Sequence, residues 1–314
     1  MKKAALTTAI LAVMASGSAA AATVYKDDTS ELKIGGRAEA RFNISDNNEK
    51  TDADSTFADK SRARLNIVGK SQISEALYGF GKYEAEFDTD ASITNRYAFA
   101  GLGTNFGEFS YGKQDSAQVM LTDITDTMAT FGADAADIVA GNKDKRSNNF
   151  LYSGEFGGFN VQANYLANDA KDADSYGIAA MYGFDFGLDL GLGYVGQTNG
   201  DDDDNQINFA AQYSIADFTL GGYYALGSVA DEDVNAFEIS ALYKLNKWTF
   251  VAVYNYNDVD TAAKQLVTGL DEVDNFAIEA VYKFNGNLRT YAGYKFEQVD
   301  NQDDQIQAGI RYDF

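Results

Sequence analysis

The sequence predicts an all-β fold, a 16-stranded antiparallel transmembrane β-barrel, and three observations support this prediction. Segments of about ten residues alternate apolar and polar side chains with a period of two, as strands do when one face meets lipid and the other meets water. The chain contains no proline, a residue that cannot donate to the hydrogen-bond ladder of a central strand. The connections between these segments alternate between short turns and long polar loops.

Residues 1–21 have the layout of a cleavable signal peptide. Lys2 and Lys3 precede a weakly apolar, alanine-rich run that ends in small residues near Ala22. A transmembrane anchor is the alternative, but several polar residues dilute the run and no stop-transfer pattern follows it. We therefore expect residues 22–314 to form the exported barrel domain.

The last ten residues show the strand pattern most clearly. In the run QIQAGIRYDF, apolar Ile306, Ile310 and Phe314 alternate with polar Gln305 and Arg311. About ten residues are enough for a tilted strand to cross a bilayer. The same template predicts sixteen strands at residues 32–42, 61–72, 77–87, 96–104, 107–114, 148–154, 159–168, 175–184, 189–197, 205–214, 218–226, 235–245, 248–257, 275–284, 288–298 and 305–314.

The connections fall into two kinds. Tight ones include NFG, FGG and NK, whereas long acidic ones include NDAKDAD, TNGDDDD and GSVADEDV. This alternation predicts short periplasmic turns on one rim of the barrel and long external loops on the other. Sixteen strands also enclose a water-filled lumen, whereas eight would be filled by side chains.

The longest connection, residues 115–147, contains apolar as well as acidic residues. A loop of this length usually has a function of its own or is disordered. Its apolar run VMLTDITDTMATFGADAADIVAG indicates that it packs against another surface. The nearest surface is the inner wall, so we expect this third external loop to fold into the barrel.

Composition excludes several classes of function. The formal charge is −22, and removing Lys2 and Lys3 leaves 23 basic against 47 acidic residues, or 23 − 47 = −24. Nucleic acid is therefore not an expected partner. The absence of histidine and cysteine removes serine–histidine hydrolases, cysteine proteases and ordinary zinc or haem sites. The residue types alone do not exclude a hydrolase that uses a pair of carboxylates. We nevertheless expect the protein to have no enzymatic activity, no cofactor and no metal site.

The acidic loops, above all Asp201 to Asp204, leave weak divalent-cation binding open, because hard cations take clustered carboxylates. No stretch has the spacing of a defined calcium loop. A hydrated vestibule that attracts cations is the favoured interpretation.

Several basic residues lie on the polar face of the predicted strands. Alternation points Arg37 into the lumen from the first strand, Arg62 and Arg64 from the second, and Arg96 from the fourth, with Tyr97 and Phe99 toward lipid. These strands are near neighbours in sequence, so a ladder of guanidinium groups is expected along one wall.

Two interpretations of this basic wall are open. The arginines could solvate a wet lumen or pair locally with Glu39 and Glu84. Alternatively, they could lie opposite carboxylates of the inserted loop, because clusters of charge at a constriction set ion selectivity.

The order of several short motifs resembles that of Gram-negative general porins of the trimeric, sixteen-stranded kind, closest to the vibrio and marine gammaproteobacterial branch. These motifs cover the whole predicted mature chain: ATVYKDD, LKIGGR, ARLNIVGK, NRYAFAGL, FGEFSYGK, TDTMATFGAD, RSNNFLYSG and a terminal RYDF. The resemblance implies a homotrimer in the bacterial cell outer membrane, reached through the periplasm. It also implies partners: membrane lipid and lipopolysaccharide, the barrel-assembly machinery and small hydrophilic solutes.

The resemblance also implies site residues for a pore constriction. The basic side is carried by Arg37, Arg64 and Arg96, together with Arg62 on the same face and Arg146 at the end of the loop. On the loop side, Asp126 and Phe131-Gly132 match the family pattern, while Ala129 and Thr130 depart from it. That departure shifts the expected acidic role toward Asp123, Asp134 and Asp137.

The terminal Tyr312 and Phe314 resemble the signal read by the barrel-assembly machinery, although an aromatic pair there also suits the membrane rim.

The function expected from these observations is passive diffusion of ions and small hydrophilic solutes, with a weak preference for cations because the net charge opposes the arginine wall. A substrate-specific barrel channel is one alternative. An outer-membrane surface adhesin or receptor is another.

Overall fold

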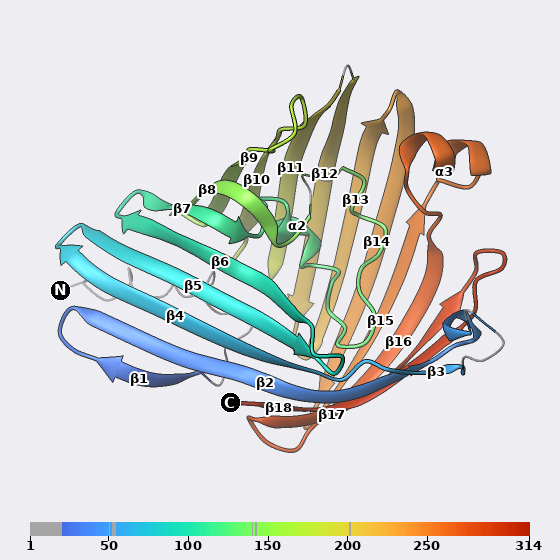
Figure 1. The fold of residues 1–314 in the computed structure, drawn as a ribbon, viewed down its shortest axis with the longest axis horizontal. Coiled ribbons are helices and arrows are strands. Elements are labelled where there is room, and N and C mark those ends of the chain that lie inside the picture. Colours follow the sequence, from blue (N-terminus) through green and yellow to red (C-terminus); the bar gives the residue numbers. More distant parts are fainter. Residues whose placement is uncertain (1–20, 50, 52–54, 140, 142, 201) are drawn as a thin grey trace.

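The computed structural model describes residues 21–49, 51, 55–139, 141, 143–200 and 202–314, so residues 1–20 of the predicted signal peptide lie outside the described residues. Within this part, eighteen strands form one sheet. Two short strands, β1 (Ala22–Lys26) and β3 (Phe57–Asp59), pair with β2. The other sixteen close into an antiparallel barrel, which confirms the predicted fold (Figure 1).

Each barrel strand pairs with its neighbours in the chain, and β18 closes the ring by pairing with β2. The strands are β2 (Ser30–Ile44), β4 (Arg62–Ser74), β5 (Leu77–Asp88), β6 (Ile93–Thr104), β7 (Gly107–Gln114), β8 (Arg146–Phe156), β9 (Phe159–Leu166), β10 (Ser175–Gly183), β11 (Leu188–Asn199), β12 (Asp202–Ile215), β13 (Phe218–Val229), β14 (Glu232–Leu245), β15 (Trp248–Asn257), β16 (Asp274–Lys283), β17 (Leu288–Glu297) and β18 (Gln305–Asp313).

Alternation along the strands places apolar side chains outside and polar side chains inside. In β18, Ile306 is 42% exposed and Ile310 46%, whereas Gln307 and Asp313 are each 6% exposed. This is the reverse of a soluble barrel, and it matches a barrel whose outer face meets lipid and whose lumen holds water.

Two of the connections predicted as long loops are tight turns, so that part of the prediction is wrong. In one, Asn199 at the end of β11 already pairs with Asp202 at the start of β12. In the other, Ala230 and Asp231 join β13 to β14 with φ of 50° and 63°. Acidic residues of these segments belong to the strands, as in the pair Thr198 and Asp203. The hydrogen bonds between strands use backbone groups alone. The strands can therefore extend beyond the residues in which apolar and polar side chains alternate.

Short helical segments lie in the longer connections. A single 3-10 turn, η1 (Asp46–Asn48), follows β2, and α3 (Ala262–Thr268) follows β15. Thr261 caps α3 by accepting a hydrogen bond from the Lys264 N–H, and Gly269 ends it at φ 66°. None of the helices in the described ranges is long and apolar enough to cross a membrane.

A β-bulge in β6 corrects the predicted orientation of two aromatic residues. Glu84 pairs with Tyr97, but the next residue, Ala85, pairs with Asn95, so Arg96 is the extra residue. One inserted residue inverts the alternation beyond it. Arg96 still faces the lumen, and Tyr97 and Phe99 face it as well, where the strict period of two had placed them toward lipid.

The pairing of β18 with β2, which closes the barrel, gives the first testable prediction. The Gly36 N–H donates to the Phe314 carbonyl (2.8 Å) and the Phe314 N–H donates to the Gly36 carbonyl (3.0 Å). A Cβ at Gly36 would meet the Arg64 carbonyl and lie 2.8 Å from the Phe314 ring, whereas a Cβ at Gly222 would meet nothing within 4 Å.

We therefore expect Gly36→Ala to lower the free energy of unfolding by about 1–3 kcal/mol, the usual cost of overpacking. Gly222→Ala is the matched control and should have little effect. Heat-dependent electrophoretic mobility of the folded barrel measures both variants, and equal melting curves would contradict the expectation.

Candidate functional site

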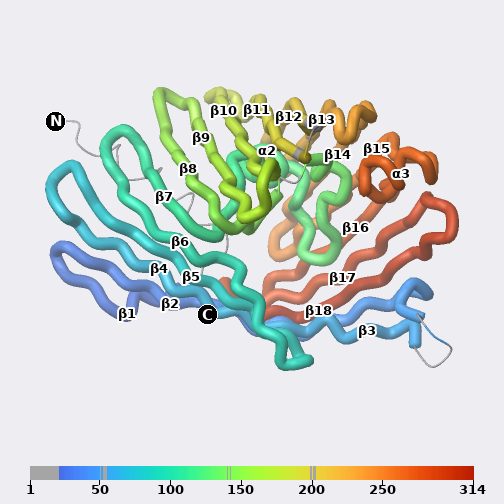
Figure 2. The backbone as a smooth tube through the Cα atoms, turned by 45° about the horizontal axis from the view of Figure 1, so that its top comes forward, coloured from blue at the N-terminus to red at the C-terminus, as the bar shows by residue number. Residues whose placement is uncertain are grey.

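The third external loop, predicted at residues 115–147, folds into the lumen and carries the short helix α2 (Val119–Thr122) (Figure 2). Its described residues are 115–139, 141 and 143–145, because β8 already begins at Arg146. Leu121 is fully buried, Ile124 and Ile138 are each 4% exposed, and Val139 is 1% exposed. These side chains form one apolar cluster with inner-wall residues of β10 to β14: Ala179, Val195, Ala210, Tyr223, Ala225, Val229, Val234 and Ala236. Burial of this apolar surface holds the loop against one side of the barrel.

Carboxylates of the barrel wall bind the backbone of the loop. The N–H groups of Ala135 (2.9 Å) and Ala136 (2.8 Å) donate to Glu238 of β14, which also accepts a hydrogen bond from the Thr125 hydroxyl. Glu279 of β16 accepts from the N–H groups of Ala129 (3.0 Å) and Thr130 (2.7 Å).

Two wall amides add to these anchors. Gln206 accepts from the Val139 N–H (3.0 Å) and donates to the Ala136 carbonyl (2.8 Å), and Asn208 donates to Gln118 (2.8 Å). These contacts satisfy backbone groups that would otherwise be buried without partners.

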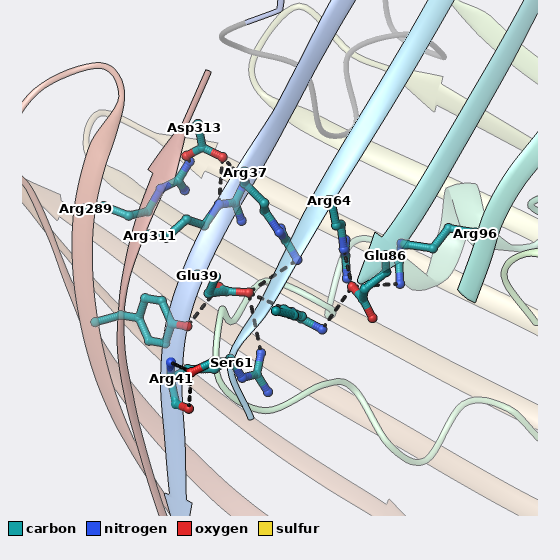
Figure 3. Close-up of polar contacts among 12 residues, drawn as sticks. Arg37, Glu39, Arg41, Ser61, Arg64, Glu86, Arg96, Arg289, Arg311 and Asp313 are labelled. Atoms are coloured by element: carbon teal, nitrogen blue, oxygen red, sulfur yellow. Dashed lines mark hydrogen bonds and ion pairs between the residues drawn. The ribbon is translucent and has the colours of Figure 1, made fainter. Parts of the chain in front are cut away.

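The predicted arginine wall lies on the opposite strands, β2, β4 and β6 (Figure 3). Arg37 pairs directly with Arg64 across β2 and β4, and Glu39 pairs with Arg62. The bulge in β6 turns Arg96 toward the same surface. The structure thus brings Arg37, Arg62, Arg64 and Arg96 together, with Arg41 of β2 beside them.

Carboxylates of β2 and β5 lie between these guanidinium groups. Glu39, whose side chain is 1% exposed, contacts Arg37 (3.6 Å), Arg41 (4.0 Å) and Arg62 (2.7 Å). Glu39 also accepts a hydrogen bond from the Tyr291 hydroxyl (2.8 Å).

Two glutamates of β5 complete the wall. Glu84 contacts Arg96 at 2.8 Å and Arg64 at 3.9 Å. Glu86 contacts Arg62 at 3.5 Å and Arg96 at 3.7 Å, and it pairs closely with Arg64. The five arginines and three glutamates named here leave a net charge of 5 − 3 = +2.

Arg146 lies at the edge of this arrangement. It begins β8, pairs in register with Gln114 and is partly buried. Its neighbour Lys145 is repelled by Arg64 and Arg96 and attracted by Asp115 and Asp126. Lys145 therefore lies within electrostatic reach of both the basic wall and the loop carboxylates, a position that strand alternation cannot reveal.

The predicted loop residues of the constriction divide into two groups. Asp123, Asp126, Asp134 and Asp137 are exposed to the lumen, as is Gly132. The carboxylate oxygens of Asp126 and Asp134 both lie beside Gly132, and Asp134 is 3.9 Å from Lys295.

Thr130 and Phe131 form the second group and do not face the open lumen. They are 9% and 7% exposed, and the Thr130 hydroxyl lies against Gly293 of β17. Thr130, one of the two positions that depart from the expected pattern, is therefore a contact with the barrel wall.

Crowding and mutual repulsion make the loop carboxylates weaker acids. The surrounding barrel wall, with repulsion from Asp115 and Asp126, raises the pKa of Asp123 to about 7. The pKa of Asp126 is raised by the surrounding wall and by Asp134, and Lys145 opposes this shift.

Comparison with known proteins assigns the family. A family model described as Gram-negative porin matches residues 6–303. Porin-like protein L of Photobacterium profundum is 38% identical over 346 residues, covering all of both chains. Outer membrane protein U of Vibrio cholerae is 36% identical over 335 residues, covering 95% of this chain and 92% of its own. The chain belongs to the Gram-negative porin family.

Solved structures agree on the fold. Salmonella typhi OmpF superposes with a TM-score of 0.79 at 21% identity, covering 93% of this porin and 100% of OmpF. The trimer form of OmpT from Vibrio cholerae superposes with a TM-score of 0.71 at 19% identity, covering 91% of this porin and 100% of OmpT. Family and fold together make this porin a channel protein of the bacterial outer membrane.

The anchors of the loop give the second prediction. Glu238→Ala removes the acceptor of the Ala135 and Ala136 N–H groups, and each unsatisfied buried donor costs about 1–3 kcal/mol. We expect the loop to detach in part, seen as excess open-channel current noise and faster proteolysis between β7 and β8.

Glu238→Gln keeps an acceptor oxygen and should be much milder, and Asp185→Ala on the periplasmic turn between β10 and β11 should leave both readouts unchanged. Equal noise and cleavage rates for Glu238→Ala and the parent channel would show that the wall carboxylate does not hold the loop.

Proposed function

We propose that this porin is a passive channel for ions and small hydrophilic solutes that weakly prefers cations. The observation that carries the proposal is the uneven compensation of charge across the lumen. The arginines of one wall have carboxylates beside them, whereas the loop exposes Asp123, Asp126, Asp134 and Asp137.

The net charge of −24 expected without Lys2 and Lys3 adds to this preference at the mouths of the pore. Conversely, the wall retains the charge of +2 counted above, so cation preference should be modest. In this proposal Arg37, Arg62, Arg64, Arg96 and Arg146 form the basic side of the constriction, and the inserted loop forms the acidic side.

We further propose a homotrimer without cofactor or catalytic activity. The trimer form of the related OmpT supports this assembly. Tyr312 and Phe314 are 50% and 44% exposed on the outer face, an accessible position for recognition by the assembly machinery and for contact with lipid or lipopolysaccharide. The surface-receptor and substrate-specific alternatives stay predictions of the sequence.

Reversal potentials in a salt gradient across a planar bilayer test the ion preference. We expect a modest cation preference for the parent channel. Removing one unit charge about 10 Å from the ion path in water changes its energy by about 0.4 kcal/mol, or about twofold in permeability ratio.

Arg96→Gln should therefore raise the cation-to-anion permeability ratio and Asp126→Asn should lower it, while Lys171→Gln on an external loop should change it little. An anion-selective parent channel would overturn the proposal.

Titration of the loop supplies a fourth prediction. Protonation removes negative charge, so the cation-to-anion ratio should fall as the pH is lowered from about 8 to about 5. Asp123 has a raised pKa of about 7, so Asp123→Asn should abolish the part of the fall that is centred near neutral pH.

Reversal potentials at several pH values measure this dependence in both proteins. A ratio that stays flat across the range, or an unchanged profile in Asp123→Asn, would contradict the assignment of this carboxyl.

A further inference from the structure

A cavity lies on the periplasmic side of the inserted loop. Its volume is about 720 Å³, within the range of small-molecule sites in proteins. The start of the loop, from Gln114 through α2 to Asp123, lines one side of it. Residues at the periplasmic turns after β4, β6 and β8 line its rim, so the cavity lies on the path of a solute crossing the barrel.

The apolar part of the lining includes three aromatic rings and two thioethers beside the aliphatic Ala76, Val119 and Leu151. Tyr78, Tyr97 and Phe99 line the wall, with Tyr78 7% and Tyr97 9% exposed. Met120 of α2 and Met181 of β10 extend this surface. Flexible, polarisable methionine side chains adapt to differently shaped apolar groups.

These aromatic rings form a connected row inside the barrel. The ring centroid of Phe80 is 6.1 Å from that of Tyr78 and 6.4 Å from that of Phe99, which is 6.4 Å from that of Tyr97. The bulge at Arg96 brings Tyr97 and Phe99 into this row. A lumen-facing aromatic surface is therefore built at this point, although most aromatic residues of the barrel face lipid.

The charged side chains of the cavity lining carry a net negative charge. Among the described lining residues, five are carboxylates and two are lysines, giving 2 − 5 = −3: Glu75, Glu108, Asp115, Asp123 and Glu155 against Lys70 and Lys82. Each lysine ammonium already lies over a tyrosine ring, Lys70 at 3.7 Å from the Tyr78 centroid and Lys82 at 3.9 Å from that of Tyr97.

We propose that this cavity binds organic cations that carry an aromatic or other apolar body. The apolar body would pack against Phe99, Met120 and Met181, and the charged nitrogen would lie among the carboxylates. The inference rests on the proposed function, because the ligand must reach the cavity through the open lumen. It adds a retention site on the periplasmic side of the constriction.

Three probes separate charge from apolar contact: benzyltriethylammonium, tetraethylammonium, which lacks the ring, and benzenesulfonate, which has a ring and a negative charge. Each is added to the periplasmic side of the full-length mature channel in a planar bilayer, and transient interruptions of the current are counted against concentration. We expect benzyltriethylammonium to bind about tenfold more tightly than tetraethylammonium, and benzenesulfonate to cause no interruptions.

Matched variants locate the site. Phe99→Leu should remove most of the advantage of the benzyl cation, and Glu155→Gln should weaken both cations. Phe284→Leu exchanges a phenylalanine on the lipid face, and Glu232→Gln exchanges an exposed acid at an external turn. Both controls should bind the probes as the parent channel does.

The outcomes separate the two proposals. A barrel that inserts without conducting fails the proposed function. A conducting channel that shows equal affinity for the three probes, or that keeps its preference in Phe99→Leu, retains the function and overturns the inference.

Discussion

The closed hydrogen-bond ladder is the constraint on which the rest of the structure depends. A strand in lipid has no water to satisfy its backbone, so the sheet must close and leave no edge. Once β18 pairs with β2, the odd or even position of a residue along its strand decides whether its side chain faces lipid or the lumen. The same rule that exposes Ile306 and Ile310 to lipid directs Arg37 and Glu39 inward.

The inserted loop has a different requirement, because its backbone lies inside the barrel and the backbone groups of the wall are already paired within the ladder. The inner surfaces of β12, β14 and β16 therefore supply acceptors from side chains: Gln206, Glu238 and Glu279. The carboxylates of this wall are occupied by holding the loop, and the loop exposes carboxylates of its own to the lumen. The lumen is thus divided between a basic wall and an anchored acidic loop.

The alternation of side chains between the two faces of each strand explains which features can be predicted from the sequence and which cannot. Strand number, inward arginines and the inserted loop follow from period-two alternation and apolar content. The inward turn of Tyr97 and Phe99 does not, because one extra residue at Arg96 inverts the pattern without any local signal. Nor do the anchors: Glu238 and Ala135 are far apart in sequence, and only the closed barrel brings them together.

The ion pairs of the basic wall make it a fixed surface. Glu39 contacts Arg37, Arg41 and Arg62, and Glu86 contacts Arg62, Arg64 and Arg96, so that Arg62 is common to both. Each of these arginines is therefore held by a carboxylate that also holds its neighbours. A nearly buried carboxylate such as Glu39 is stable only while its partners remain, and these come from two different strands. Since the strands are fixed by the ladder, the width of the passage depends on the loop, whose position rests on a few hydrogen bonds and one apolar cluster.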